Sequence, residues 1–347
     1  MKKYYPLFSK LSGKLFGAQS LAQSASRVEE IAPGEIPPLP PVAMDESQRE
    51  KVTRAEARTS LAAEWQKIEG RPENRNGPST RYEFDNVLAT PDGFFSPRYS
   101  HNKWGKLDFS ALLKGEIAEV EQGFHGLRSI GARYFGHWVM DCLPTTKLRR
   151  PEESLFFPTP ENWPHALAYE KVFGLEPLAH DYVFFRKMAF CDDIGKNSHL
   201  GARLQALRGE VHAYCGATGG KKVYLRRGAT GVARTITNED ELTEALAAQG
   251  YEIVDAQADL DTILAACTRA SIVISMEGSH FANCMLPADA DTRFVIINPA
   301  DRFCNVWSDY LGVMGGHMGT VIAAKDGDGY FVDIAHLLDF SERMLAG

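Results

Sequence analysis

The sequence predicts an α/β protein whose second half is built on a parallel sheet. From Lys221 to Ala324, short runs rich in β-branched residues alternate with helix-length amphipathic segments. Strict alternation of strands and helices implies parallel strands with crossover helices on both faces of the sheet. Ligands of such sheets bind at the carboxyl ends of the strands, so polar residues at those ends are the first candidates for a site.

The elements of this half follow one another with short connections. The predicted strands are Lys221–Arg227, Tyr251–Ala256, Ser271–Met276, Arg293–Pro299 and His317–Ala324. The predicted helices are Asn238–Gly250, Asp259–Ala270, a short Ser279–Leu286, Asn305–Gly316 and a final Val332–Leu345.

The first half is also predicted to be α/β, although its strand order cannot be read from the pattern. The predicted strands are Tyr82–Thr90, Ser154–Thr159 and Asp181–Phe190, and the predicted helices are Gly136–Leu148 and His165–Gly174. Upstream, the proline-dense stretch Ile31–Val42 indicates a linker or a surface strap. We therefore expect an N-terminal extension over 1–79, domains over 80–212 and 213–330, and a C-terminal helix over 331–347.

Composition bounds the functional class. The 347 residues are 44% hydrophobic and 24% charged, which is typical of a globular protein rather than a disordered or membrane-embedded one. The net charge of −7 and the absence of a long Lys/Arg block argue against a general nucleic-acid binder. The six scattered cysteines form no CxxC pair, and the acidic turns read as surface turns, so we expect no metal site.

The N-terminus has no uninterrupted apolar run long enough for a signal peptide or a membrane span, which favours a cytoplasmic protein. Apolar and aromatic residues are interleaved there with Lys2, Lys3, Lys10 and Lys14. Residues 1–25 could form a helix lying on an anionic membrane, giving peripheral contact at the inner membrane face. The alternative is a terminal segment that packs on its own protein or frays.

Arginines gather where the first strand of the second half ends. Arg226 and Arg227 close that strand, and Arg234 precedes the helix that Thr237 or Asn238 is expected to cap. The helix N-terminus would place amide groups and a positive dipole end beside the arginines, which is the chemistry of a pyrophosphate site. The alternative is a solvated pair of charges at a strand end.

A second candidate follows the strand Ser271–Met276. Its turn contains Glu277, Gly278, Ser279 and His280 and opens a helix that carries Asn283. Glycine there lets a ligand approach the backbone, and Glu277 and His280 could contact sugar hydroxyls or a leaving phosphate. The alternatives are ordinary punctuation between a strand and a helix, with His280 satisfied by backbone.

The first half contributes a histidine and a carboxylate. If Gly136–Leu148 is helical, His137 and Asp141 lie at i and i+4 on one face. A carboxylate there would orient the imidazole and raise its basicity, as a general base requires. An amphipathic core helix with a capping histidine is the alternative, and His125 is a candidate of lower rank.

Taken together, these motifs resemble glycosyltransferase family 61. The resemblance runs from about Phe124 to Ile322 and is carried by YFGHWVMDCLP, then KVYLRR with Arg234 and Asn238-Glu239, then the stretch from Gly250 to Ser275 and its glycine turn. By motif position it implies that Arg226, Arg234 and Asn238 are donor-binding, that His137 matches the histidine of the Gly-His stretch, and that Gly278 and Asn283 belong to the family's glycine turn.

The resemblance also implies a fold and a reaction. It implies two Rossmann-like domains facing across a cleft, the GT-B-type architecture, and an inverting transferase that needs no metal or other cofactor and uses a nucleotide-sugar co-substrate. Many bacterial members serve capsule or surface-polysaccharide biosynthesis, so the expected acceptor is a glycan or glycolipid. The sequence departs from the family at Glu277, where many members have histidine, at Ser279, where alanine is usual, and at Leu225, where serine is usual.

The expected mechanism is a single displacement. Arg226 and Arg234 neutralise the leaving diphosphate, with Arg227, Ser279 and His280 as further donor contacts, and His137 or else Glu277 takes the proton of the acceptor hydroxyl.

We expect the donor to carry a uridine nucleotide, with a cytidine-linked acidic sugar as the alternative. A non-catalytic nucleotide- or glycan-binding component of a polysaccharide assembly complex stays open, whereas a dinucleotide oxidoreductase lacks the expected GxGxxG.

Overall fold

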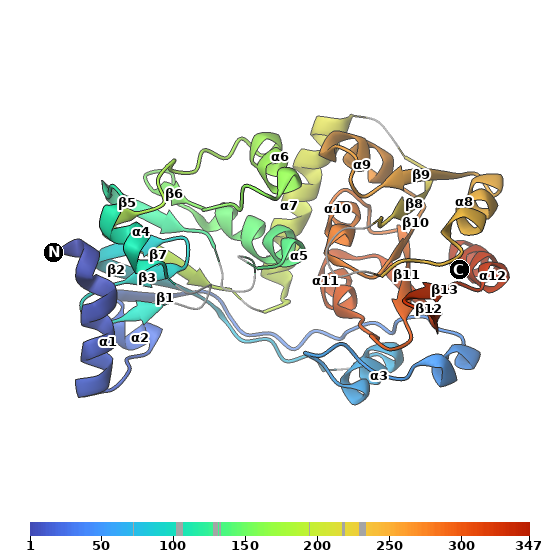
Figure 1. The fold of residues 1–347 in the computed structure, drawn as a ribbon, viewed down its shortest axis with the longest axis horizontal. Coiled ribbons are helices and arrows are strands. Elements are labelled where there is room, and N and C mark those ends of the chain that lie inside the picture. Colours follow the sequence, from blue (N-terminus) through green and yellow to red (C-terminus); the bar gives the residue numbers. More distant parts are fainter. Residues whose placement is uncertain are drawn as a thin grey trace. The chain divides into compact units, whose positions relative to one another are not determined.

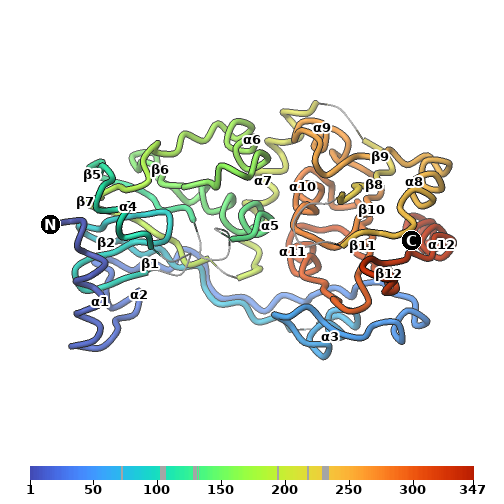
Figure 2. The backbone as a smooth tube through the Cα atoms, in the orientation of Figure 1, coloured from blue at the N-terminus to red at the C-terminus, as the bar shows by residue number. Residues whose placement is uncertain are grey.

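The chain folds into two compact units in this computed structural model. The structure describes residues 1–71, 73–101, 107–127, 131, 133–193, 195–216, 219–228 and 234–347. Unit 1 comprises Met1–Gly34 and Gly77–Gly195, and unit 2 comprises Glu35–Asn76 and Lys196–Gly347. The chain therefore leaves unit 1, enters unit 2 and returns before its second half begins, as the colours of Figure 2 let the reader follow.

Unit 1 contains a mixed sheet with the strand order β4-β3-β2-β7-β5-β6, and β1 pairs with β2. The strands β5, β6 and β7 run parallel to one another, whereas β2 is antiparallel to β1, β3 and β7. The strand bounds are β1 Arg27–Ala32, β2 Ser79–Thr90, β3 Gly93–Phe95, β4 Ser100–His101, β5 Ala118–His125, β6 Ser154–Phe156 and β7 Val183–Asp192. The α/β prediction is confirmed, and the strands β1, β3, β4 and β5 are additions to it.

The helices of unit 1 are short. They are α1 Tyr5–Phe16, α2 Leu21–Ser24, α4 Phe109–Lys114, α5 Phe135–His137 and α6 Pro164–Val172, with a 3₁₀ turn at Lys2–Tyr4. The helical stretch predicted over Gly136–Leu148 is confirmed, but it changes type along its length: α5 passes into a π-helix, Trp138–Cys142, and then a 3₁₀ helix, Leu143–Leu148. Pro144 has no amide hydrogen to continue an α-helical ladder, so the backbone changes its hydrogen-bonding pattern there.

Unit 2 contains the parallel sheet that the alternating pattern predicts. Its strand order is β13-β12-β11-β10-β8-β9. The pairs β8–β9, β8–β10, β10–β11 and β11–β12 are parallel, and only the edge pair β12–β13 among the described strands of this sheet is antiparallel. The bounds are β8 Lys222–Arg226, β9 Tyr251–Asp255, β10 Ile272–Met276, β11 Arg293–Pro299, β12 His317–Asp326 and β13 Gly329–Phe331.

Helices connect the strands of unit 2 and cover its sheet (Figure 1). They are α3 Leu61–Glu69, α7 Ser198–Cys215, α8 Glu239–Ala248, α9 Leu260–Cys267, α10 Ala282–Met285, α11 Val306–Met314 and α12 Ile334–Ala346, with 3₁₀ turns at Glu46–Lys51 and Ser279–Phe281. The helices α3 and α7 are not among the predicted helices above; in α7, Gly201 and Arg208 lie among the buried residues and weaken the apolar pattern of that face. The buried strand residues Tyr224, Ile274 and Ile297 belong to the core of this unit.

Residues 35–76 form a strap on unit 2. Ala43 bridges to Gly319 and Ala55 to Phe303, so the strap pairs with β12 and with the connection after β11. The fully buried Glu64 carboxylate accepts hydrogen bonds from the Asn305 amide (2.6 Å) and from Lys67 (3.2 Å). The strap is therefore fixed by buried polar contacts as well as by backbone pairing.

No helix within the described ranges has the length and apolar character needed to cross a membrane.

Candidate functional site

Three neighbouring parallel strands of unit 2 end at a cluster of charged side chains. Arg227 follows β8, Glu277 follows β10 and Arg302 lies in the connection after β11. These strands are adjacent in the order β11-β10-β8, and the carboxyl ends of parallel strands meet at one edge of a sheet. The topology therefore brings together three residues that are far apart in the sequence.

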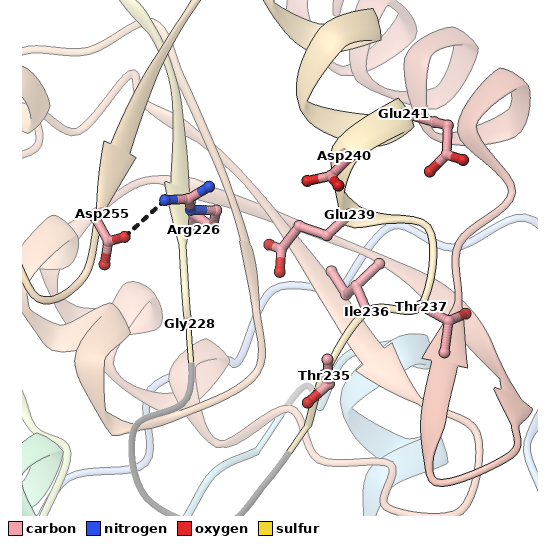
Figure 3. A pocket seen from close by; sticks show the side chains of 9 residues that line it. All are labelled: Arg226, Gly228, Thr235, Ile236, Thr237, Glu239, Asp240, Glu241 and Asp255. Atoms are coloured by element: carbon pink, nitrogen blue, oxygen red, sulfur yellow. Dashed lines mark hydrogen bonds and ion pairs between the residues drawn. The ribbon is translucent and has the colours of Figure 1, made fainter.

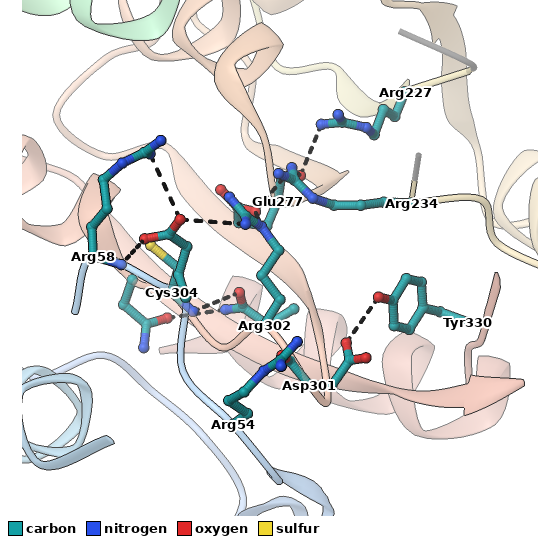
Figure 4. A network of polar contacts seen from close by, with 12 residues as sticks. Arg54, Arg58, Arg227, Arg234, Glu277, Asp301, Arg302, Cys304 and Tyr330 are labelled. Carbon is teal, nitrogen blue, oxygen red and sulfur yellow. Dashed lines mark hydrogen bonds and ion pairs between the residues drawn. The ribbon is translucent and has the colours of Figure 1, made fainter. Parts of the chain in front are cut away.

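Glu277 organises this cluster with both its backbone and its side chain (Figure 4). Its carbonyl oxygen accepts hydrogen bonds from Arg227 Nη1 (3.0 Å) and Arg234 Nη1 (2.5 Å). Its carboxylate pairs with Arg234 Nη1 at 2.9 Å and lies 3.6 Å from Arg302 Nε. Three guanidinium groups thus converge on one acidic residue, and we call Arg227, Arg234, Arg302 and Glu277 the arginine cluster.

The charged groups of the arginine cluster lie close together and largely out of water. Arg227, Arg234 and Glu277 are 6%, 7% and 5% exposed, so little water screens them. Burial, and next the charge of Arg234, lowers the pKa of Arg227 to about 10. Burial also lowers the pKa of Arg234, an effect that Glu277 opposes. An anion bound beside these groups would relieve the repulsion between them.

The strap adds a second carboxylate to the cluster. Glu56, which is 8% exposed, lies with Oε1 3.3 Å from Arg302 Nη1 and 3.6 Å from Arg58 Nη1. Its position is set by backbone pairing, because the Glu56 amide donates to the Phe303 carbonyl at 3.0 Å and the Phe303 amide donates to the Arg54 carbonyl at 2.9 Å. Glu56 therefore holds Arg302 from a segment nearly 250 residues away in the chain.

Position 278 favours glycine because a side chain there would collide with neighbouring side chains, and not because of its backbone conformation. A Cβ atom at this position would lie 1.7 Å from Arg227 Nη1, so any side chain would displace that guanidinium group. The glycine thereby lets Arg227 reach the carbonyl oxygen of Glu277.

His280 is held as a neutral imidazole beside the arginines. Arg227 Nη1 lies 3.3 Å from its Nδ1, and its Nε2 lies 2.9 Å from Ser275 Oγ, which donates to the Leu225 carbonyl at 2.7 Å. Arg227 can only donate, so Nδ1 accepts and Nε2 carries the hydrogen. Burial first, and then the charges of Arg227 and Arg234, holds the pKa of His280 well below its ordinary value of 6.5.

Arg226 points to a different place from Arg227. Its Nη2 pairs with Asp255 Oδ2 at 2.9 Å, in a polar pocket of about 400 Å³ (Figure 3). Glu239, at the start of α8, also lines this pocket and accepts a hydrogen bond from Tyr224 at 2.8 Å. Burial raises the pKa of the Glu239 carboxyl. The geometry separates Arg226 from the arginine cluster that gathers on Glu277.

The other predicted donor contacts of unit 2 have diverse surroundings. Asn238 makes no capping hydrogen bond to α8, contrary to the prediction, because its side chain exchanges two hydrogen bonds with the Val332 backbone (2.9 and 3.0 Å). Asn238 therefore ties the start of α8 to the segment after β13. Ser279 begins the 3₁₀ turn beside the arginine cluster and is partly buried, and Asn283 is buried in α10.

His137 and Asp141 form a hydrogen-bonded pair in unit 1. Nδ1 of His137 lies 2.6 Å from Asp141 Oδ2, and the side chains are 28% and 5% exposed. Asp141 lies within the π-helix, and single π-helical turns occur frequently at functional sites. If Nδ1–H donates to the carboxylate, Nε2 keeps the lone pair that a general base uses.

His125 has a structural environment. It is 2% exposed and surrounded by the rings of Phe94, Phe156 and Phe190. Burial, with a contribution from His101, lowers the pKa of His125 to about 3. The imidazole is therefore neutral in a largely aromatic core.

Sequence reasoning missed Arg302 and Glu56. Arg302 had a usable signal, since it follows a predicted parallel strand adjacent to the one that precedes Glu277. Glu56 had none, because only tertiary pairing of the strap brings it to the cluster. In the part of the chain that the structure describes, no group of three or more His, Cys, Asp or Glu side chains is arranged to hold a metal ion.

Comparison with known proteins gives a match that covers much of this part of the chain. No curated protein matches the sequence. The family model described as Glycosyltransferase 61 matches residues 135–295, a stretch that begins just before His137 and extends past Glu277. Arg302 and Glu56 lie outside it. The match supports a glycosyltransferase of family 61.

Proposed function

We propose that this chain is an inverting glycosyltransferase of the GT-B type. It would move a sugar from a nucleotide-sugar donor, for which a uridine diphosphate sugar is the first candidate, to a hydroxyl group of a glycan or glycolipid acceptor in polysaccharide biosynthesis. The observation that carries the proposal is the arginine cluster, in which Arg227, Arg234 and Arg302 converge on Glu277. The family match supports the class of reaction.

The arginine cluster would bind the diphosphate of the donor. Guanidinium groups form paired, charge-assisted hydrogen bonds with phosphate oxygens, and these bonds strengthen as charge develops on the leaving group. Arg227 and Arg234 are held by the Glu277 carbonyl, and Arg302 is held by Glu56. The cations are thus preorganised, so little reorganisation is needed when the bond to the sugar breaks. They also supply the charge that a divalent metal would otherwise provide.

The pocket at Arg226 would receive the hydroxyl-bearing part of the donor. Asp255 and Glu239 offer carboxylate acceptors there, and Arg226 offers donors. A mixture of acceptors and donors suits vicinal hydroxyl groups better than it suits a phosphate, because the lining carries more acidic than basic side chains. The diphosphate role therefore falls to Arg227, Arg234 and Arg302 rather than to Arg226.

The reaction would be a single displacement. The acceptor oxygen forms a bond to the anomeric carbon, the bond from that carbon to the diphosphate oxygen breaks, and the nucleoside diphosphate leaves with both bonding electrons. The proton of the acceptor hydroxyl passes to Nε2 of His137, whose Nδ1 is bound to Asp141. Glu277 is the second choice for the base, and its contacts with Arg234 and Arg302 favour a positioning role instead.

Incubation of the purified chain with a panel of nucleotide sugars tests this proposal. We expect one donor to raise the melting temperature and to release its nucleoside diphosphate in the presence of EDTA, with the product of inverted anomeric configuration by NMR. The Arg234→Gln variant should lose both effects. Arg186→Gln, which alters an exposed ion pair in unit 1, is the matched control.

Two results would separate the competing functions. Donor binding without any turnover across acceptors would favour a non-catalytic component of a polysaccharide assembly complex. Retention of anomeric configuration, or a requirement for a metal ion, would contradict the proposed mechanism while leaving the family assignment intact.

A further inference from the structure

The N-terminal helix α1 carries its large apolar side chains on the outside. Leu7, Phe8, Leu11, Leu15 and Phe16 are 48%, 42%, 56%, 66% and 85% exposed. Most of these positions are three or four residues apart, so they form a stripe along one face of the helix. An ordinary surface helix turns such a stripe toward its own core, and this helix does the opposite.

Small and polar groups occupy the opposite face, which contacts unit 1. Ser9 is 4% exposed, and Ser12 and Gly13 are partly buried. Turning the apolar stripe inward would place these residues in solvent and would lose the contacts described below. The orientation of the helix is therefore a consequence of which face fits unit 1.

Lysines and an aromatic ring fasten this helix to unit 1. Lys3 Nζ donates to the carbonyl oxygens of Leu113 and Gly115, at 2.7 Å each. Lys2 pairs with Glu119 and lies 3.8 Å from the centroid of the Phe184 ring, which Tyr5 also contacts edge-on. The helix α1 lies beside the sheet of unit 1 (Figure 1), and these contacts fix the orientation in which its apolar stripe is presented.

The N-terminal segment that contains α1 carries positively charged side chains and no acidic ones over residues 1–28. No aspartate or glutamate occurs before Glu29, whereas Lys10 and Lys14 are exposed on α1. Lysines that flank exposed leucine and phenylalanine side chains suit a surface with an apolar interior and an anionic boundary. A bilayer containing anionic lipids has both features, and charge complementarity selects it over a neutral apolar partner.

We propose that the exposed stripe of α1 binds the interface of an anionic lipid bilayer. The helix would lie in the membrane plane, with Leu11, Leu15 and Phe16 among the acyl chains and Lys10 and Lys14 at the headgroups. This inference does not depend on the proposed glycosyltransferase function.

Co-sedimentation of the full chain with vesicles tests the proposal. We expect binding to vesicles that contain phosphatidylglycerol, weaker binding to pure phosphatidylcholine vesicles, and loss of the difference at high salt. The triple variant Leu11→Ser/Leu15→Ser/Phe16→Ser should bind anionic vesicles at least about 10-fold more weakly, since it removes most of the inserted apolar surface. Lys10→Glu/Lys14→Glu should abolish the preference for anionic vesicles.

Matched controls keep the outcome interpretable. Ile36→Ser and Phe331→Ser change side chains that are 50% and 49% exposed elsewhere in the chain, and they should bind as the wild type does. All variants should keep the wild-type melting temperature. Equal vesicle binding by the triple variant would overturn the proposal. A dimer of the wild type that the triple variant converts to a monomer, without vesicle binding by either, would show that a second copy covers the stripe and would overturn it as well.

Discussion

Glu277 gives the arginine cluster its geometry through two separate groups. Its carbonyl oxygen holds Arg227 and Arg234, and its carboxylate holds Arg234 and approaches Arg302. A neutral histidine at this position could not pair with two guanidinium groups in this way.

Gly278→Ala should disable Arg227 without removing it. The added Cβ would lie 1.7 Å from Arg227 Nη1, so the guanidinium group must leave the Glu277 carbonyl. We expect donor turnover to fall by about 10²–10³-fold, the usual cost of losing one preorganised donor to the transition state. Steady-state kinetics measures this, with Gly209→Ala as control, because a Cβ at Gly209 meets no atom within 4 Å. Equal loss in both variants would contradict the assignment.

Asp141→Asn should impair catalysis more than donor binding. An asparagine amide can donate to Nδ1 of His137, which would move the imidazole hydrogen to Nε2 and remove the lone pair that takes the acceptor proton. We expect kcat to fall by about 10²–10⁴-fold with little change in donor KM. The control is Glu161→Gln, an exposed carboxylate of the same unit. An unchanged kcat, or a loss confined to the donor KM, would exclude His137 as the base.

For individual residues, the sequence singled out three of the four members of the arginine cluster, Arg227, Arg234 and Glu277. It did not reveal which of these side chains contact one another. Arg226 and Arg227 are adjacent at the end of β8, and successive side chains of a strand point to opposite faces. Which of the two joins Glu277 depends on the register of β8 and β10, which no local pattern reveals. Thr237 or Asn238 was expected to cap α8, but the side chain of Asn238 bonds instead to the backbone of Val332, nearly a hundred residues later.

Two elements outside regular α/β alternation shape the candidate sites. The π-helix at Trp138–Cys142 carries Asp141, and the strap carries Glu56. The strap lies outside the family match, which covers residues 135–295. Its pairing with the chain after β11 makes it part of the surroundings of the arginine cluster.

Glu64→Ala should loosen the strap and weaken donor binding together. Glu64 is fully buried and accepts hydrogen bonds from the Asn305 amide, Lys67 and Thr59. Removing one partner of a buried ion pair costs about 3–5 kcal/mol of stability, because the remaining groups lose their partner. Chemical denaturation measures the first effect and calorimetric donor titration the second.

Glu69→Ala is the control for the strap, since this carboxylate is 63% exposed on the same helix α3. It should change the free energy of unfolding by no more than about 0.5 kcal/mol. A Glu64→Ala variant that loses stability but binds donor normally would show that the strap does not support the site.

Elements were predictable where burial imposed a simple pattern. The strands of unit 2 are flanked by helices and read as apolar β-branched runs, so the parallel sheet followed from the sequence. In unit 1, β5 reads as a charged segment, AEVEQGFH, and β1 runs into the start of the proline-rich stretch. Only tertiary pairing with β7 and β2 makes these segments strands.

For the whole molecule, buried histidines contribute to the loss of folding stability in acid. The pKa of His125 is lowered to about 3 by burial, while an unfolded chain binds a proton near pH 6.5. Between these values the unfolded state holds more protons than the folded state, so the free energy of unfolding falls as the pH drops. His280, whose pKa is also lowered, acts in the same direction.

His125→Leu should flatten this dependence. We expect the slope of unfolding free energy between about pH 4 and 6 to decrease by up to about 1.4 kcal/mol per pH unit, the contribution of one proton. Urea denaturation at several pH values measures it. His180→Leu, at an exposed position of the same unit, should leave the slope unchanged. A His125→Leu curve parallel to that of the wild type would show that this imidazole is protonated in the folded state.

The central claim is that the arginine cluster binds the diphosphate of a nucleotide-sugar donor. Calorimetric titration with UDP, UMP and uridine tests it most directly, using the wild type, Arg234→Gln, Arg302→Gln and the control Arg186→Gln. We predict that affinity falls from UDP to UMP to uridine, and that each cluster variant weakens UDP binding by about 10- to 100-fold, as expected for the loss of a charge-assisted hydrogen bond, without affecting uridine. Equal affinity of the wild type and both cluster variants for UDP would contradict the account.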